Sequence, residues 1–118
     1  MMTIIGYDKC STCKKAKAWL EERGIAFESR PIQEENPTAE ELRAWWVCSG
    51  LPLKRFFNTS GLRYKALGLK DRLSEMSEDE QLELLASDGM LVKRPILVDG
   101  GRVLVGFRPQ EWEQALEG

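Results

Sequence analysis

A chain of 118 residues is long enough to form one domain around a buried core that needs no disulfide bonds. Its formal net charge is −2, so the composition gives no support for a nucleic-acid-binding surface. No stretch approaches the roughly 18 apolar residues of a membrane span. Residues 1–8 lack the basic and apolar regions of a secretory signal, so we expect a cytoplasmic protein.

The first third of the chain predicts a strand, a helix and a second strand. Residues 3–7 are β-branched and aromatic, as in a buried strand. From Ser11 the apolar residues follow a helical spacing, and Gly24 is placed to end that helix. Residues 25–32 then predict another strand. The crossover is long enough for a parallel β–α–β unit.

The middle of the chain is predicted to be helical. A helix begins with Pro37 near its first position and a capping box at Thr38, and it ends at Gly50. Prolines and glycines interrupt residues 51–73, so we expect short helices and turns there. A second capping box, at Ser77, starts another helix.

The end of the chain returns to β-structure. Residues 95–98 and 102–105 flank an Asp-Gly-Gly turn, which predicts a hairpin, and Pro109 opens a last helix. This order resembles that of thioredoxin-like proteins. We therefore expect one α/β domain over residues 1–118, with a mixed four-stranded sheet and a helical insertion at about 37–89 between its β–α–β and β–β–α halves.

The strongest candidate for chemistry is the pair Cys10 and Cys13 at the start of the first helix. A helix N-terminus offers unpaired N–H groups and a partial positive charge, and both favour the nucleophilic thiolate. The chain has no histidine, so a cysteine must be activated in some such way. We expect Cys10, in the loop, to attack and Cys13, on the helix, to resolve the mixed disulfide.

The cysteines also allow roles without redox chemistry. Zinc sites use the same spacing, but zinc needs four ligands and the only other cysteine, Cys48, is distant; we expect no metal site. Cys10 and Cys13 could also be packed without any redox role. Cys48 is expected to be buried or without a role, with a distant resolving function as the alternative.

Three motifs together resemble one family. Residues 10–16 (CSTCKKA), the sequence Arg94-Pro95-Ile96, and residues 105–109 (VGFRP) are similar to the glutaredoxin-type arsenate reductase (ArsC) superfamily. This group also includes Spx-type transcription regulators and YffB-like thiol reductases. The resemblance covers essentially the whole chain.

The resemblance implies roles for particular residues. Cys10 corresponds to the nucleophile of the reductases, and Arg94 and Arg108 to two of three arginines around a bound oxyanion. Pro95 matches a cis-proline held beside the active cysteine. We add Lys9, Ser11 and Thr12 as anion-binding candidates, because they flank the cysteine at the N-terminus of the helix.

Two departures from the family bear on its activity. The third arginine is replaced by Asn58, for which Arg55 or Arg63 could substitute. Glutaredoxin-linked arsenate reductases also lack the second cysteine, whereas this chain has Cys13, as Spx and related branches do.

The sequence therefore favours a thiol–disulfide oxidoreductase. We expect a monomer with no bound cofactor, glutathione as a possible co-substrate, and glutathione, glutaredoxin or thioredoxin as electron donor. The alternatives are a glutaredoxin-dependent arsenate reductase and an Spx-like redox regulator that binds the RNA polymerase alpha subunit. We expect direct contact with neither nucleic acid nor a membrane.

Overall fold

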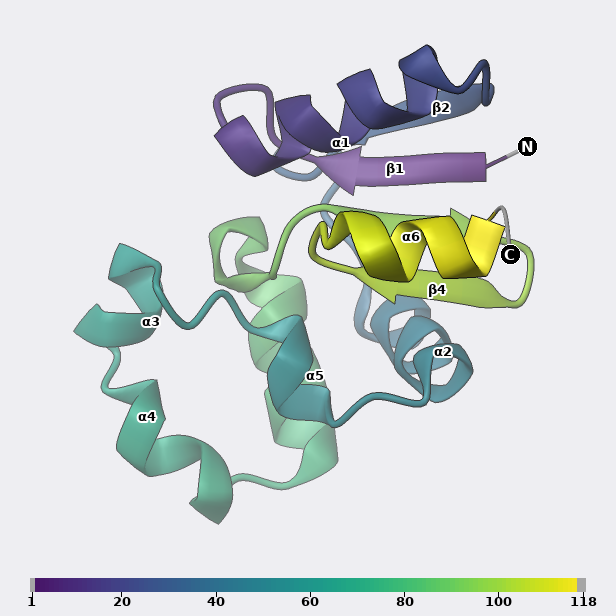
Figure 1. The fold of residues 1–118 in the computed structure, drawn as a ribbon. Helices are drawn as coiled ribbons and strands as arrows, with labels where there is room; N and C mark the ends of the chain where they lie inside the picture. The colour runs from purple at the N-terminus through teal and green to yellow at the C-terminus, as the bar shows by residue number, and fades with distance from the viewer. Residues whose placement is uncertain (1, 117–118) are drawn as a thin grey trace.

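The computed structural model describes residues 2–116, and its first half is the expected β–α–β unit. Strands β1 (Met2–Gly6) and β2 (Phe27–Pro31) pair in parallel, and α1 (Ser11–Glu22) connects them (Figure 1). Gly24 follows α1 with a φ of +67°, a backbone conformation that favours glycine, so the predicted end of the helix is confirmed.

The insertion consists of the longer helices α2 and α5 and a series of short helical turns. In chain order they are α2 (Ala39–Ser49), η1 (Leu53–Phe56), α3 (Leu62–Ala66), α4 (Leu69–Arg72), η2 (Leu73–Glu75), α5 (Glu78–Ser87) and η3 (Gly89–Leu91). Both predicted capping boxes form: Thr38 pairs with Glu41 at the start of α2, and Ser77 with Glu80 at the start of α5. The sequence thus predicts where these two helices begin, because the capping residues form local hydrogen bonds there.

The last third supplies β3 (Ile96–Asp99), β4 (Arg102–Val105) and α6 (Pro109–Leu116). Within residues 2–116 the sheet has four strands in the order β2-β1-β3-β4. Strand β3 runs antiparallel to both β1 and β4, which confirms the mixed thioredoxin-like sheet.

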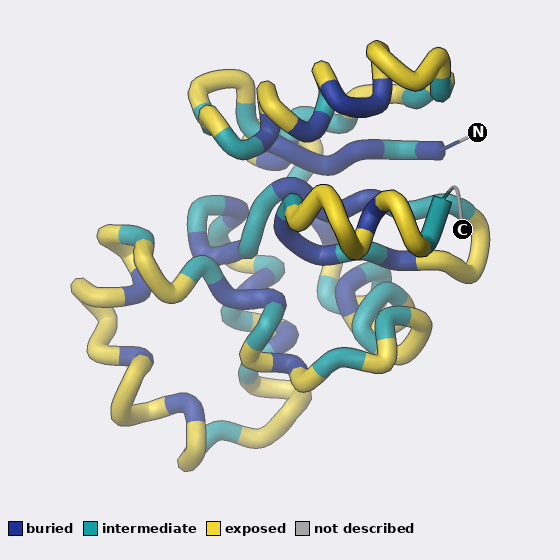
Figure 2. Tube along the Cα trace, viewed as in Figure 1, coloured by how far each residue is buried: buried dark blue, intermediate teal, exposed yellow. Residues whose placement is uncertain are grey.

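The two faces of the sheet carry different layers (Figure 1). Because side chains alternate along a strand, the neighbours Ile4 and Ile5 face opposite ways. Ile4 joins a cluster with Trp19 of α1 and Trp112 of α6, whereas Ile5 joins the larger cluster formed with the insertion. Figure 2 shows the buried strands between these layers and the exposed outer turns of α1, α3 and α4. The insertion is therefore packed onto one face of the sheet and shares a hydrophobic cluster with it.

Three details refine the sequence predictions. Pro37 precedes the N-cap instead of occupying the first helical position, because the Thr38 hydroxyl accepts the Glu41 N–H and is itself the cap. Cys48 is exposed, so its predicted burial is wrong: it follows Val47, which is 70% exposed, on the solvent side of α2. No helix within residues 2–116 is long and apolar enough to cross a membrane.

Candidate active site

Cys10 is the N-cap of α1. Its backbone is extended, with φ −85° and ψ 117°, and its Sγ accepts the N–H of Cys13 at 3.4 Å. The Cys10 N–H donates to the Tyr7 carbonyl at 2.9 Å, which closes the turn between β1 and α1. Cys10 is half-buried, so its sulfur meets both the helix N-terminus and solvent.

Cys13 lies one turn further and is only 1% exposed. It packs against the end of β1 so closely that a Cβ on Gly6 would stand 3.0 Å from the Cys13 Sγ. A side chain at this position would require the Cys13 sulfur to shift by a few tenths of an ångström. The motif thus holds one accessible and one buried sulfur.

The pKa values of the two thiols are shifted in opposite directions. Burial raises the pKa of Cys10, but hydrogen bonds from the Cys13 thiol and amide, the charge of Arg94 and the Thr12 amide outweigh it and lower the pKa below its ordinary value. Burial above all raises the pKa of Cys13 to about 12, and the neighbouring Cys10 adds to the rise. Cys10 therefore forms the thiolate more readily than an ordinary cysteine, while Cys13 keeps its proton near neutral pH.

Arg94 and Pro95 lie beside this pair. The Arg94–Pro95 peptide bond is cis, as the resemblance implied. The Arg94 guanidinium lies 5.6 Å from the centre of the Tyr7 ring and donates to the Met90 Sδ at 3.2 Å. No ion pair with a carboxylate involves Arg94 within residues 2–116, so its charge remains available to an anion.

A cleft of about 600 Å³ opens next to the motif. It begins at Thr12, two residues after Cys10, and its far wall is η1 with the residues that follow it. Its lining comprises Thr12, Pro52, Lys54, Arg55, Phe57, Thr59, Lys93, Val105, Gly106, Phe107 and Arg108. The cleft thus joins the start of α1 to the helical insertion.

Backbone hydrogen bonds hold the two walls together. Gly106 donates to the carbonyl of the cis-proline Pro95 at 2.8 Å, and its own carbonyl accepts the Trp112 indole N–H at 3.1 Å. The Lys93 N–H donates to the Phe56 carbonyl at 2.8 Å, which attaches η1 to the segment that leads to the cis-proline. Residues distant in sequence are thereby fixed around one opening.

The predicted site residues fall into two groups. Arg94 and Pro95 lie at the cysteine pair, and Thr12 and Arg108 line the cleft. Lys9 and Ser11 are exposed at the turn, outside the cleft lining, so their role stays a prediction. Among the described residues no group of metal-ligating side chains could hold an ion.

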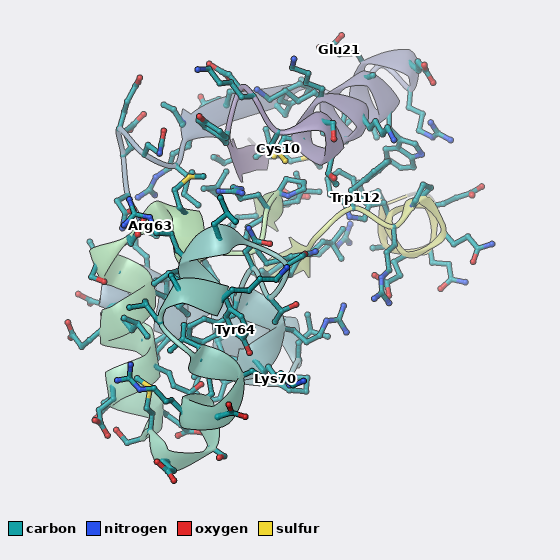
Figure 3. The ribbon with its side chains drawn as sticks, turned by 90° about the vertical axis from the view of Figure 1, so that its left-hand side faces the viewer. Cys10, Glu21, Arg63, Tyr64, Lys70 and Trp112 are labelled. Atoms are coloured by element: carbon teal, nitrogen blue, oxygen red, sulfur yellow. The ribbon has the colours of Figure 1, made fainter. Side chains whose placement is uncertain are left out.

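Arg55 is the residue that sequence reasoning could not place. It lines the cleft, while Arg63, the other candidate substitute, pairs with Asp88 at 3.6 Å. Figure 3 shows Cys10 between α1 and the insertion, with Arg63 away from it toward the edge of the view. Asn58, at the family's third arginine position, is not itself part of the lining.

The chain is similar in sequence to one protein family and to several named relatives. The family model described as "ArsC family" matches residues 5–115. The relative named "Uncharacterized protein YusI", from Bacillus subtilis, is 56% identical over 96% of both chains. "Regulatory protein MgsR", from the same organism, is 34% identical over 93% of this chain and 86% of its own. "Global transcriptional regulator Spx" from Enterococcus faecalis is 32% identical over 94% of this chain and 83% of its own.

Solved structures agree with this family. A protein from Bacteroides fragilis described as ArsC family related superposes with a TM-score of 0.93 at 54% identity, covering 96% of this chain and 95% of that one. An arsenate reductase from Vibrio cholerae superposes with a TM-score of 0.79 at 31% identity, covering 98% and 97%. The thiol motif and the insertion thus lie in a fold shared by proteins with reductase and regulator names.

Proposed function

Because this chain belongs to the ArsC family, we propose that it is a thiol–disulfide oxidoreductase in which Cys10 attacks and Cys13 resolves. The observation that carries the proposal is that the two thiols differ in exposure and have pKa values shifted in opposite directions. The accessible sulfur has a lowered pKa, and the buried sulfur one turn away has a raised pKa. A nucleophile and a resolving thiol need these properties.

The reaction has two exchanges. The Cys10 thiolate attacks a disulfide RSSR, forming the bond between Cys10 and one sulfur and releasing the other as RS⁻. Cys13 then loses its proton and attacks the Cys10 sulfur, forming the Cys10–Cys13 disulfide and releasing the second RS⁻. The protein gives up two electrons and the substrate gains them. One released thiolate corresponds to the proton lost by Cys13, and the other takes up a proton from solvent, where Cys10 had released its own.

Cys13 becomes more reactive after the first exchange. Once the Cys10 sulfur is in a mixed disulfide, it no longer carries the negative charge that contributes to the raised pKa of Cys13. The chain has no histidine, so the leaving thiolate or water accepts the Cys13 proton. The first step thereby promotes the second.

The protein must be reduced again after each turnover. We propose that glutathione, glutaredoxin or thioredoxin supplies the electrons as a soluble donor, with no resident prosthetic group. A free dithiol of this kind works in a reducing compartment, and we propose the cytoplasm. The chain is proposed to act as a monomer.

Stoichiometric oxidation tests this function. The reduced protein is mixed with bis(2-hydroxyethyl) disulfide, released thiols are counted, and the new disulfide is located by mass spectrometry. We expect two thiols per chain and a Cys10–Cys13 bond. No reaction at Cys10, or a disulfide that involves Cys48, would overturn the proposal.

An Spx-like regulator is the second candidate, favoured by the similarity to MgsR and Spx. There the pair would act as a switch controlling contact with the RNA polymerase alpha subunit. A pull-down with that subunit, with the protein oxidised and reduced, separates the two. The reduction potential adds a second criterion: a value near about −270 mV, as in thioredoxin, favours the reductase, and a much more oxidising one the switch.

Arsenate reduction is the third candidate, because the Vibrio cholerae structure described as an arsenate reductase shares the fold at 31% identity. Asn58 at the third arginine position weakens this assignment. Coupled arsenate turnover with glutathione and glutaredoxin decides it, and no turnover would dismiss it.

A further inference from the structure

The cleft beside the cysteine motif is rich in positive side chains for which the described residues supply no carboxylate partner. Lys54 and Arg55 come from η1, and Lys93 precedes the Arg94–Pro95 bond. Across residues 2–116 these three side chains take part in no ion pair with a carboxylate.

Several arginines elsewhere on the described surface do have carboxylate partners. Arg30 forms a two-pronged bond with Glu41, at 2.6 and 2.8 Å, and Arg63 pairs with Asp88 at 3.6 Å. Arg55 is half-buried, so its guanidinium is partly removed from water without a counter-ion from the described chain. Partly desolvated charge is costly unless it meets an opposite charge, so the cleft is complementary to an anion.

The position of these cations relates them to the thiol chemistry. Thr12 lines the cleft, and its amide also helps to lower the pKa of Cys10. Lys93 is adjacent to Arg94, whose charge acts on Cys10. A molecule bound against Lys54 and Arg55 would therefore extend toward the nucleophile across the start of α1.

We infer that this cleft binds the carboxylates of a small anionic disulfide, with Lys54, Arg55 and Lys93 as its anion-binding residues. The inference rests on the proposed function and adds a substrate class to it. A volume of about 600 Å³ suits a molecule of a few hundred daltons. Arg55 supplies from the insertion the positive charge that the Asn58 position lacks.

The negative overall charge of the protein would by itself disfavour anionic disulfides, so a measured preference for them would be informative. The chain carries a formal net charge of −2, and the Cys10 thiolate is itself negative. Both would slow the approach of an anionic disulfide compared with a cationic one. A preference for anions therefore requires local positive charge near Cys10 that outweighs them.

Three disulfides of similar size test the inference: dithiodipropionate with two negative charges, bis(2-hydroxyethyl) disulfide with none, and cystamine with two positive charges. Each rate of Cys10 oxidation is measured in a Cys48→Ser background and divided by the same variant's rate with the neutral disulfide. We expect the anion to react about tenfold faster than the cation at low salt, with the preference falling as ionic strength rises.

Variants assign the effect to the cleft. The double variant Lys54→Gln/Arg55→Gln should lose most of the preference, and the matched control Arg63→Gln should keep it, because Arg63 lies in the insertion but outside the lining. Circular dichroism confirms that the variants are folded. If the double variant does not fold, Lys54→Gln alone serves, since Lys54 is exposed.

The outcomes separate the two proposals. Equal reaction of all three disulfides, or an anion preference that the cleft variants retain, overturns the anionic substrate while the oxidoreductase stands. No reaction of Cys10 with the neutral disulfide overturns the oxidoreductase itself.

Discussion

The start of α1 and the turn η1 face the same cleft but supply it with different groups. The start of α1 provides Thr12 to the lining and places Cys10 and the buried Cys13 beside it. The turn η1, from the insertion, provides Lys54 and Arg55 and no thiol. The sheet-forming part of the chain thus carries the proposed nucleophile, and the insertion carries the positive charge that we propose selects the substrate.

This difference suggests how one scaffold serves several activities. The cysteine environment depends on local geometry: an N-cap, a close approach to Gly6 and a neighbouring arginine. The far wall depends on which side chains the insertion places on η1. Changes there would alter the partner while leaving the thiol chemistry in place, in a family whose members include named reductases and regulators.

The largest expected effect is at Cys10. Cys10→Ser should reduce disulfide exchange to the rate without protein, because Cys13 is buried and protonated near neutral pH. Thiol release from a neutral disulfide measures this. The control Cys48→Ser should retain full exchange, and residual turnover in Cys10→Ser would mean that another thiol is the nucleophile.

Cys13→Ser should stop the reaction halfway. The first exchange proceeds and one thiol is released, but the mixed disulfide persists because no buried partner resolves it. Intact-mass measurement should find the substrate half bound to Cys10. Release of a second thiol in this variant would show that resolution does not need Cys13.

Arg94→Gln should slow the reaction of the Cys10 thiol without abolishing it. Loss of the positive charge raises the pKa of Cys10, so a smaller fraction is thiolate near neutral pH. Alkylation by iodoacetamide should be severalfold slower there and should approach the wild-type rate at alkaline pH. Arg63→Gln serves as the control, and an unchanged pH profile in Arg94→Gln would refute the electrostatic role.

The smallest effect concerns the attachment of the insertion to the sheet. Glu41 of α2 pairs with Arg30 of β2, chiefly lowering the pKa of Glu41 to about 2. Glu41→Gln should lower the free energy of unfolding by about 1 kcal/mol at neutral pH, since the pair is partly exposed and screened. Urea denaturation measures the loss.

The pH dependence of this stability difference identifies the ion pair as its cause. A carboxylate with a depressed pKa stabilises the fold above its unfolded pKa of about 4.3, and this contribution disappears as pH falls toward the folded value. The difference between wild type and Glu41→Gln should therefore begin to shrink below about pH 5 and disappear as the pH reaches about 2. Glu80→Gln, the same capping-box position in α5 without a described ion pair, should show a smaller difference. A gap that persists in acid would exclude the ion pair as its source.

The sequence predicts one side of the cleft far better than the other. Cys10, Cys13 and the capping boxes at Thr38 and Ser77 have short-range signals: fixed spacings, helix ends and turn residues. The mixed four-stranded sheet and the cis Arg94–Pro95 bond followed from resemblance combined with these local patterns. Local chemistry was therefore predictable from the order of residues.

The residues of the cleft could be identified only from the folded structure. Arg55 and Lys93 are separated by 38 positions, and the backbone bond from Lys93 to Phe56 brings their segments together. No periodicity marks Arg55 as facing a cleft or Arg63 as paired with Asp88. The exposure of Cys48 was missed for the same reason, because helix orientation depends on tertiary packing.

The pH dependence of Cys10 alkylation tests the central claim most directly. In a Cys48→Ser background, the rate at Cys10 is followed from acid to alkaline pH by mass spectrometry, with Cys13 as the internal comparison. We expect a half-maximal rate below the ordinary thiol pKa of about 8.5 at Cys10, and negligible reaction of Cys13 near neutral pH. A midpoint at or above that ordinary value, or faster reaction at Cys13, would contradict the assignment of Cys10 as nucleophile.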